Sequence, residues 1–316
     1  MVSIYRPLWR GLLPVAILLL QLLALVASEL PRHKIVVLTQ KRYNSLGRLI
    51  DSLLAATYEG DIVDIEFHVD QVALTASAYF AREGDVIGRQ KVLDMLERFE
   101  WPYGKKRIQE NRVFQGIRGQ WLGAYVSPFA SNEGEVVVIL EDDIVVSPWF
   151  FYWLKRAHRA FANRTDVAGF SLQRRKITAS GAAIANVQTQ NNTPYLQLQV
   201  GPWGFSPRRE VWAQFVQEYD NIDIDQNTLI SSAWYRKHQE EGRSHAMWTH
   251  HFLSYCKEET LYTVFPNLPG GLELAVHREV DGEHFSGPTT VGTAVERGML
   301  QEEYTGALAS FEPDHP

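Results

Sequence analysis

Three consecutive acidic residues, Glu141, Asp142 and Asp143, are the side chains in this sequence best placed to do chemistry. An apolar run comes directly before them, which predicts that a buried strand delivers all three carboxylates to one place. Carboxylates held this close repel one another unless a cation or hydrogen-bond donors neutralise them. A hard ion such as Mn²⁺ or Mg²⁺ fits this role and keeps open positions for phosphate oxygens. The alternative is a solvated acidic turn that caps the next helix.

Two more charged side chains follow predicted strands. Arg42 comes shortly after the apolar strand at 34–39, and Asp70 ends the strand at 62–69. Ligands of open parallel sheets bind outside the carboxyl ends of the strands, so Arg42, Asp70 and the acidic triplet are expected to lie along one edge. The alternatives are a surface salt bridge for Arg42 and a helix N-cap or strand-end turn for Asp70.

The elements that position these residues alternate between strand and helix patterns. Strands are predicted at 34–39, 62–69 and 135–140. Helices are predicted from Asn44 or Ser45 as the cap to 54, at 77–99 with a loop at Gly84 or Gly88, at 116–126 and at 149–161. This order predicts an α/β fold with a mainly parallel sheet and helices on both faces. The stretch 174–193 lacks apolar periodicity and is expected to be an excursion from one domain.

Composition limits the possible functions. The 316 residues are 45% hydrophobic, enough for one large core, and a formal net charge of −6 with mixed signs argues against a nucleic-acid binder. The sole cysteine, Cys256, excludes an intrachain disulfide and is expected to be a small buried apolar residue.

The N-terminus predicts contact with a membrane. Arg6 and Arg10 lie in residues 1–10, and an apolar run follows at 11–27. The run predicts one hydrophobic transmembrane anchor helix with a cytosolic N-terminus and a body in the lumen of the Golgi or endoplasmic reticulum, a single-pass type II arrangement. The alternative is a cleaved signal and a secreted protein. Asn163 and Asn191 begin glycosylation sequons that fit a lumenal body.

Residues 141–151, EDDIVVSPWFF, resemble the metal-binding strand end and following helix of GT-A-fold glycosyltransferases, nearest to the N-acetylglucosaminyltransferase I-like group. Residues 36–42, 48–54, 67–71 and 201–205 are similar to further short motifs of that group. The resemblance implies a GT-A (Rossmann-like) catalytic domain at 34–295, followed by a C-terminal tail at 296–316.

The resemblance also implies a function and a set of roles. A metal-dependent, inverting enzyme would move a sugar from a nucleotide-sugar donor, a UDP-sugar, to a glycan or glycoprotein acceptor. Asp143 would bind Mn²⁺ or Mg²⁺, while Asp142 and Glu141 would orient the ribose and the groups around the metal. Arg42 and Asp70 would hold the nucleoside diphosphate. Metal and arginine would stabilise the negative charge that builds on the leaving group.

One departure from the family concerns the catalytic base. In the segment 245–252, the acid pair that the family carries after its tryptophan is replaced by Thr249 and His250. An imidazole can take the proton of the acceptor hydroxyl, so His250 is the candidate base. Asp225, Glu240 and Glu241 are alternatives close in sequence.

The C-terminal stretch and the aromatic residues add further candidates. The segments 268–271, 276–279 and 282–285 have the composition of a lid, in which His277 or His284 would complete the metal site and Arg278 would meet the diphosphate. The rings of Trp203, Trp248 and Phe205 are candidates for stacking on sugars, with core packing as the alternative.

Two other function classes remain open from the residues alone. A strand that ends in Asp142 and Asp143 also suits a receiver-like or phosphatase-like Mg²⁺ site, in which an aspartate is phosphorylated. The absence of the acid pair at Thr249 and His250 also fits a non-catalytic carbohydrate- or nucleotide-binding protein on a degenerate transferase fold.

Overall fold

The computed structural model describes residues 33–74, 82–124, 135–174, 193–222, 224, 239–242, 245, 247–268 and 272–277. None of the helices in these ranges is both long enough and apolar enough to cross a bilayer. The predicted anchor at 11–27 and the tail at 296–316 lie outside the described residues, as does most of the predicted excursion.

Strands and helices alternate over the first half of the chain, and short strands dominate the second. In chain order the elements are β1 (His33–Thr39), α2 (Tyr43–Leu54), β2 (Val63–Val69), α3 (Glu83–Arg98), β3 (Lys106–Glu110), α4 (Gly116–Ala124), β4 (Val137–Glu141), β5 (Ile144–Val146), α5 (Phe150–Ala160), β6 (Val167–Ser171), β7 (Tyr195–Gln197), β8 (Phe205–Pro207), α6 (Arg209–Glu218), the 3₁₀ helix η2 (Tyr219–Asn221), α8 (Trp248–Glu258), β9 (Tyr262–Phe265) and β10 (Ala275–His277).

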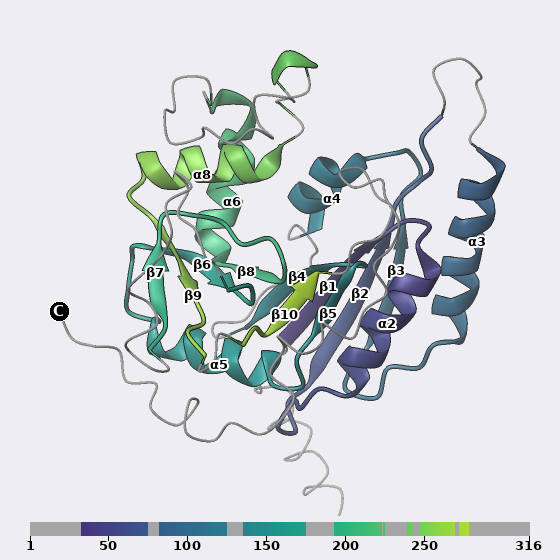
Figure 1. The fold of residues 1–316 in the computed structure, drawn as a ribbon, viewed down its shortest axis with the longest axis horizontal. Helices are drawn as coiled ribbons and strands as arrows, with labels where there is room; N and C mark the ends of the chain where they lie inside the picture. Colours follow the sequence, from purple (N-terminus) through teal and green to yellow (C-terminus); the bar gives the residue numbers. More distant parts are fainter. Residues whose placement is uncertain are drawn as a thin grey trace, which may run out of the picture.

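A central eight-stranded sheet has the order β3-β2-β1-β4-β8-β6-β9-β7 (Figure 1). β1 pairs in parallel with β2 and β4, β2 with β3, and β6 with β9. β8 is antiparallel to β4 and β6, and β7 is antiparallel to β9. The predicted α/β fold with a mainly parallel sheet is therefore confirmed. β5 and β10 form a separate antiparallel pair that lies beside the sheet.

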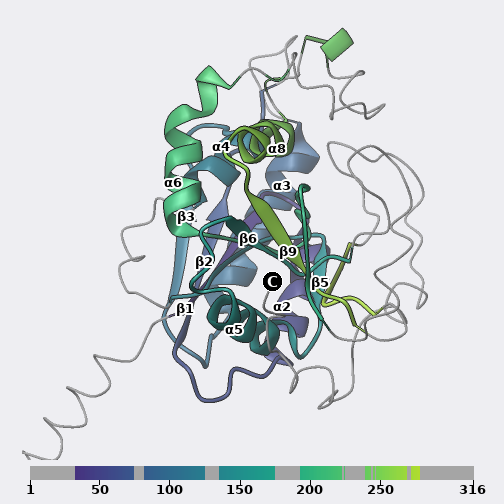
Figure 2. The ribbon, with the colours of Figure 1, turned by 90° about the vertical axis from the view of Figure 1, so that its left-hand side faces the viewer.

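Helices cover both faces of the sheet, as predicted (Figures 1 and 2). Along β1, Ile35 and Val37 pack with α2, α3 and α5, whereas Val36 and Leu38 pack with α4, α6 and α8. Because helices bury both faces of the sheet, the central strands have continuous apolar sequences rather than alternating ones.

One predicted helix cap is wrong. Helix α2 begins at Tyr43, and Arg42 occupies its N-cap position without a side-chain cap, so neither Asn44 nor Ser45 caps it. The side chain of Arg42 instead reaches the acidic triplet, as described below. Helix α5 begins at Phe150, within one residue of the predicted start, and follows the short strand β5, which the sequence pattern did not predict.

The loop predicted at Gly84 or Gly88 is also wrong, because both glycines lie inside α3. A Cβ atom at Gly88 would lie 2.8 Å from the backbone oxygen of Lys41, whereas a Cβ atom at Gly84 would meet nothing within 4 Å. Gly88 therefore allows α3 to approach the loop after β1, next to Arg42, and is not a helix break.

Candidate donor and metal site

The acidic triplet lies in the turn between β4 and β5. Glu141 is the last residue of β4 and pairs with Leu38 of β1, and the backbone N–H of Asp142 donates to the oxygen of Leu38 across 3.1 Å. Asp143 then leads directly into β5, which pairs with β10. The turn is thus held by strands on both sides, and its side chains project at the carboxyl edge of the parallel strands, as predicted.

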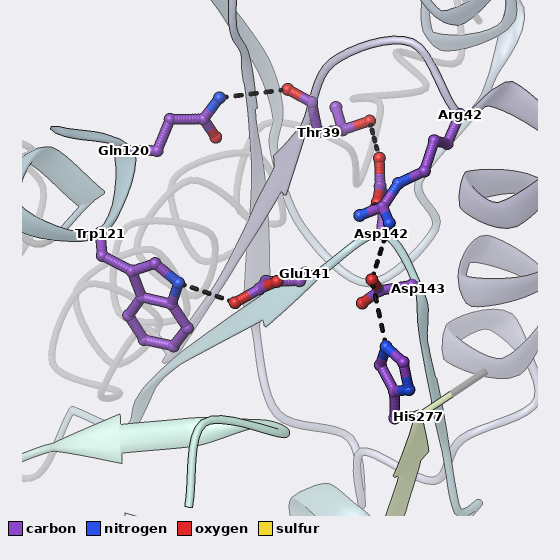
Figure 3. Close-up of polar contacts among 8 residues, drawn as sticks. All are labelled: Thr39, Arg42, Gln120, Trp121, Glu141, Asp142, Asp143 and His277. Carbon is purple, nitrogen blue, oxygen red and sulfur yellow. Dashed lines mark hydrogen bonds and ion pairs between the residues drawn. The ribbon is translucent and has the colours of Figure 1, made fainter. Parts of the chain in front are cut away.

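Arg42 neutralises two of the three carboxylates (Figure 3). Its guanidinium contacts Asp142 Oδ1, and its Nη1 donates to Asp143 Oδ2 across 2.8 Å. The hydroxyl of Thr39 donates to the other oxygen of Asp142 at 2.7 Å. Burial lowers the pKa of Arg42, but the charges of Asp142 and Asp143 outweigh it and raise the pKa above its usual value. Arg42 is therefore permanently charged.

Asp143 has a second basic neighbour, His277, the last residue of β10. The distance from His277 Nε2 to Asp143 Oδ2 is 3.4 Å. Burial raises the pKa of Asp143, but its contacts with His277 and Arg42 outweigh burial and leave the pKa below the usual value. Burial lowers the pKa of His277, but the hydrogen bond and the charge of Asp143 outweigh burial and raise the pKa above its usual value. The other oxygen of Asp143, Oδ1, is buried and has no hydrogen-bond partner.

Glu141 is turned away from Asp143 and toward α4 (Figure 3). The indole N–H of Trp121 donates to Glu141 Oε1 across 2.9 Å. Burial, together with the nearby charge of Asp143, raises the pKa of Glu141 to about 7, although the bond from Trp121 opposes the shift. Only Asp142 and Asp143 therefore contact the guanidinium of Arg42, and Glu141 instead contacts the indole of Trp121.

Asp70 lies at the same sheet edge, but its carboxylate organises the start of α4. Its Oδ1 accepts from the backbone of Gln71, the amide of Asn111 and the backbone of Gln115, and its Oδ2 accepts from the backbone of Gly116 at 2.9 Å. The side chain is 1% exposed. The carboxylate thus binds the N-terminal backbone of α4 from 46 positions earlier in the chain, whereas the sequence alternatives were an N-cap residue or a strand-end turn. A nucleoside contact by Asp70 stays a prediction.

His250 lies in the first turn of α8, half-buried, with its Nδ1 3.3 Å from the hydroxyl of Thr249. Trp248, at the start of α8, stacks on Trp121 of α4 at a centroid distance of 4.2 Å. α8 therefore packs against α4, whose Trp121 donates a hydrogen bond to Glu141. The role of His250 as a base stays a prediction.

The other candidates are placed as follows. Glu240 and Glu241 are exposed, while Asp225 lies outside the described residues. His284 and Arg278 also lie outside them.

The aromatic candidates divide into core and site residues. Phe205 is 0% and Trp248 is 3% exposed, so their rings belong to the core packing that was the alternative to sugar stacking. Cys256 is buried in the same cluster, as expected. Trp203 is half-buried and stacks on His277, at the edge of the site.

The donor set at Asp143 has the chemistry of a divalent metal site. In the described ranges, no three His, Cys, Asp or Glu side chains converge as a metal cage. Carboxylate and imidazole are nevertheless both ligands of Mn²⁺, and such ions are commonly held by one or two protein groups plus phosphate oxygens. Asp143 Oδ1, buried without a partner, is the atom such an ion would satisfy. Asp143 and His277 therefore fit a metal that a phosphorylated ligand completes.

Sequence reasoning missed Thr39, Gln120 and Trp121 as parts of the site. Gln120 Nε2 donates to the backbone oxygen of Thr39 at 3.4 Å, and Thr39 in turn holds Asp142. No spacing in the sequence connects these residues to the triplet, because each contact joins two different elements of the sheet edge.

No family model matches this chain, and no curated protein matches it. Solved structures that align with part of this chain include the following three. A mannosyltransferase, PcManGT from Pyrobaculum calidifontis, in complex with GDP-Man and Mn²⁺, has 14% identity and a TM-score of 0.36, over 60% of this chain and 47% of that one.

Two further solved structures among the matches have lower sequence identity. S. aureus TarS residues 1–349 have 10% identity and a TM-score of 0.37, over 74% of this chain and 57% of that one. GalNAc-T7 with UDP, GalNAc and Mn²⁺ has 10% identity and a TM-score of 0.46, over 76% of this chain and 43% of that one. The chain thus aligns with about half the length of these proteins. Likenesses at this level carry no functional inference.

Proposed function

We propose that this chain is a glycosyltransferase of the GT-A type that uses a nucleotide-sugar donor and a divalent metal. One observation carries the proposal: Asp143 presents a buried oxygen without a hydrogen-bond partner, beside His277 and Arg42, at the carboxyl edge of the parallel strands. Such an edge is where open α/β sheets bind their ligands.

The charges suit a nucleoside diphosphate. Asp143 and His277 would hold Mn²⁺ or Mg²⁺, and the bound ion would supply a positive charge next to the diphosphate. Arg42, which is charged at any physiological pH, lies against the same carboxylate and so within the same region. Asp142 and Glu141 would face the ribose, and the donor we propose is a UDP-sugar.

The transfer itself needs a proton acceptor on the acceptor side. We assign this role to His250, whose imidazole would take the proton from the acceptor hydroxyl as that oxygen bonds to the sugar and the diphosphate leaves. Attack from the side opposite the leaving group inverts the configuration at the sugar carbon. Arg42 stabilises the negative charge that develops on the diphosphate. The acceptor is a glycan or a glycoprotein.

The N-terminal segment supports a proposal about the location of the protein. We propose that residues 11–27 anchor the chain in the membrane of the Golgi or endoplasmic reticulum, with the catalytic domain in the lumen. Secretion after cleavage of this segment is the alternative.

A non-catalytic nucleotide- or carbohydrate-binding protein is the second candidate. It is favoured by Thr249 and His250, which stand where an acid pair is expected. Both candidates bind the donor, but only an enzyme releases nucleoside diphosphate from it.

A thermal-shift panel of nucleotide sugars with and without Mn²⁺ tests donor binding. We expect one nucleotide family to raise the melting temperature only with Mn²⁺, because a ligand that binds only the folded state stabilises it. Asp143→Asn should abolish this shift. Asp166→Asn is the matched control, since Asp166 pairs with Arg164 away from the triplet. If no nucleotide sugar shifts the wild type, the proposal is wrong.

Turnover separates the two candidates. We expect the wild type to release nucleoside diphosphate slowly by hydrolysis even without an acceptor, and His250→Gln to lower transfer by about 10²–10⁴-fold with little change in donor binding. Donor binding without release under any condition would favour the non-catalytic candidate.

A further inference from the structure

Trp203 stacks on the imidazole of His277, and His277 contacts Asp143. The centroids of the two rings lie 5.3 Å apart with an interplanar angle of 19°. His277 Nε2 lies 3.4 Å from Asp143 Oδ2. The three side chains come from three different parts of the fold: the loop before β8, the end of β10 and the turn after β4.

Hydrogen bonds hold the backbone on both sides of Trp203. Ser171 Oγ donates to the oxygen of Gly201 at 2.9 Å, and the N–H of Leu172 donates to the oxygen of Gly204 at 2.9 Å. A Cβ atom at Gly201 would lie 2.2 Å from Ser171 Oγ, and Gly204 has a φ of +74°. Only glycine fits both positions, so the loop presents Trp203 from a rigid base.

His277 is the less constrained partner of the pair. Its backbone is held opposite Ile144 in the β10–β5 ladder, but 27% of its side chain is exposed. A partly exposed imidazole can rotate away from Asp143 unless a neighbouring side chain restricts it. The flat face of the indole supplies this restriction, and stacked ring pairs favour one orientation.

We propose that Trp203 is a positioning residue, whose indole holds the imidazole of His277 against Asp143 so that the metal site is assembled before its ligand arrives. The inference rests on the proposed metal-assisted function. Trp203 touches neither metal nor donor in this role. It lowers the cost of binding because His277 need not be ordered at that moment.

The first experiment measures Mn²⁺ affinity in the presence of UDP, by electron paramagnetic resonance of the free ion. We expect Trp203→Leu to weaken Mn²⁺ binding about tenfold. Trp203→Phe, which keeps an aromatic face, should restore most of the affinity. Tyr195→Leu is the matched control, because it removes a stack of the same kind, Tyr195 on Phe265 at 5.6 Å, from the edge of the sheet.

A double-mutant cycle tests whether the effect passes through His277. In a His277→Ala background, Trp203→Leu should change Mn²⁺ affinity by less than about twofold, because the group that it positions is gone. An equal loss in both backgrounds, or no loss in the single variant, overturns the inference. If instead the wild type binds neither Mn²⁺ nor UDP, the proposed function is wrong.

A second measurement needs no metal or nucleotide. Carbethoxylation of His277 by diethyl pyrocarbonate, followed by mass spectrometry, reports how freely the ring is presented. We expect metal-free Trp203→Leu to react several-fold faster at His277 than the wild type or Tyr195→Leu. Equal rates in folded protein, checked by thermal unfolding, overturn the positioning role even if the glycosyltransferase proposal holds.

Discussion

The indole N–H of Trp121 donates to Glu141 Oε1 across 2.9 Å, and this bond separates one member of the acidic triplet from the other two. Trp121 is itself stacked on Trp248 of α8. Glu141 and the helix that carries His250 are therefore joined through two tryptophans.

Loss of this bond should destabilise the protein. We expect Trp121→Phe to lower the free energy of unfolding by about 1–3 kcal/mol more than Trp212→Phe does, measured by urea denaturation. Trp212 is the matched control because it is 0% exposed and its indole nitrogen has no partner. Equal losses would show that the bond to Glu141 contributes nothing.

Arg42 should stabilise the metal-free fold. In Arg42→Ala, Asp142 and Asp143 remain buried without their shared cation, and we expect a loss of about 3 kcal/mol in EDTA. The second substitution in Arg42→Ala/Asp142→Asn should recover part of it. Arg164→Ala, which breaks an exposed ion pair, should cost less than about 1 kcal/mol. If Arg42→Ala also lowered the free energy of unfolding by less than about 1 kcal/mol, Arg42 would not be stabilising the fold through Asp142 and Asp143.

Two glycines of one helix should respond in opposite directions to alanine. Gly84→Ala should stabilise the protein by up to about 1 kcal/mol, because its Cβ atom meets nothing within 4 Å and alanine favours helix. Gly88→Ala should destabilise it, since the new Cβ atom would press on the backbone oxygen of Lys41. Chemical denaturation of both variants checks the pair, and stabilisation by Gly88→Ala would show that α3 can shift freely.

Acid should destabilise the fold partly through His33. Burial lowers the pKa of His33 to about 4, although Asp61 opposes the shift, and its Nδ1 accepts the backbone N–H of Val136 at 3.1 Å. Below pH 6.5 the unfolded chain binds a proton at this residue and the folded chain does not until about pH 4. Above pH 6.5 His33 does not change the free energy of unfolding. As the pH falls from 6.5 to about 4, His33 lowers the free energy of unfolding by about 1.4 kcal/mol per pH unit.

The variant His33→Asn keeps an acceptor for Val136 but cannot be protonated there. We expect the slope of unfolding free energy against pH, measured by urea denaturation between pH 6.5 and 4.5, to be shallower in this variant. Parallel curves for the two proteins would show that His33 is not the group responsible.

A lumenal location predicts a glycan at Asn163. Asn163 and Thr165 are both exposed, in the turn between α5 and β6. We expect the full chain expressed in secretory cells to lose mass on treatment with peptide N-glycosidase F, and Asn163→Gln to lose part of that shift. Asn191→Gln reports the second sequon separately. A full chain without any shift would count against passage through the lumen.

Sequence patterns predicted several of the long, buried elements, although the buried strand β6 was not predicted. Strands β1 and β4 were found as short continuous apolar runs, and helices α2 and α5 were found because their apolar residues repeat at helical spacing. Strand β3 was missed because it is a polar edge strand with few buried side chains, and β5 and β8 because three residues are too few to show a period.

The sequence by itself determined that a buried strand ends in Glu141, Asp142 and Asp143, because apolar periodicity and the adjacent acids are local features. The tertiary structure alone decided how these acids differ. Arg42 and Asp143 are separated by 101 positions, and Thr39 and Asp142 by 103. Local patterns carry no information on such contacts, since it is the parallel pairing of β1 with β4 that brings them together.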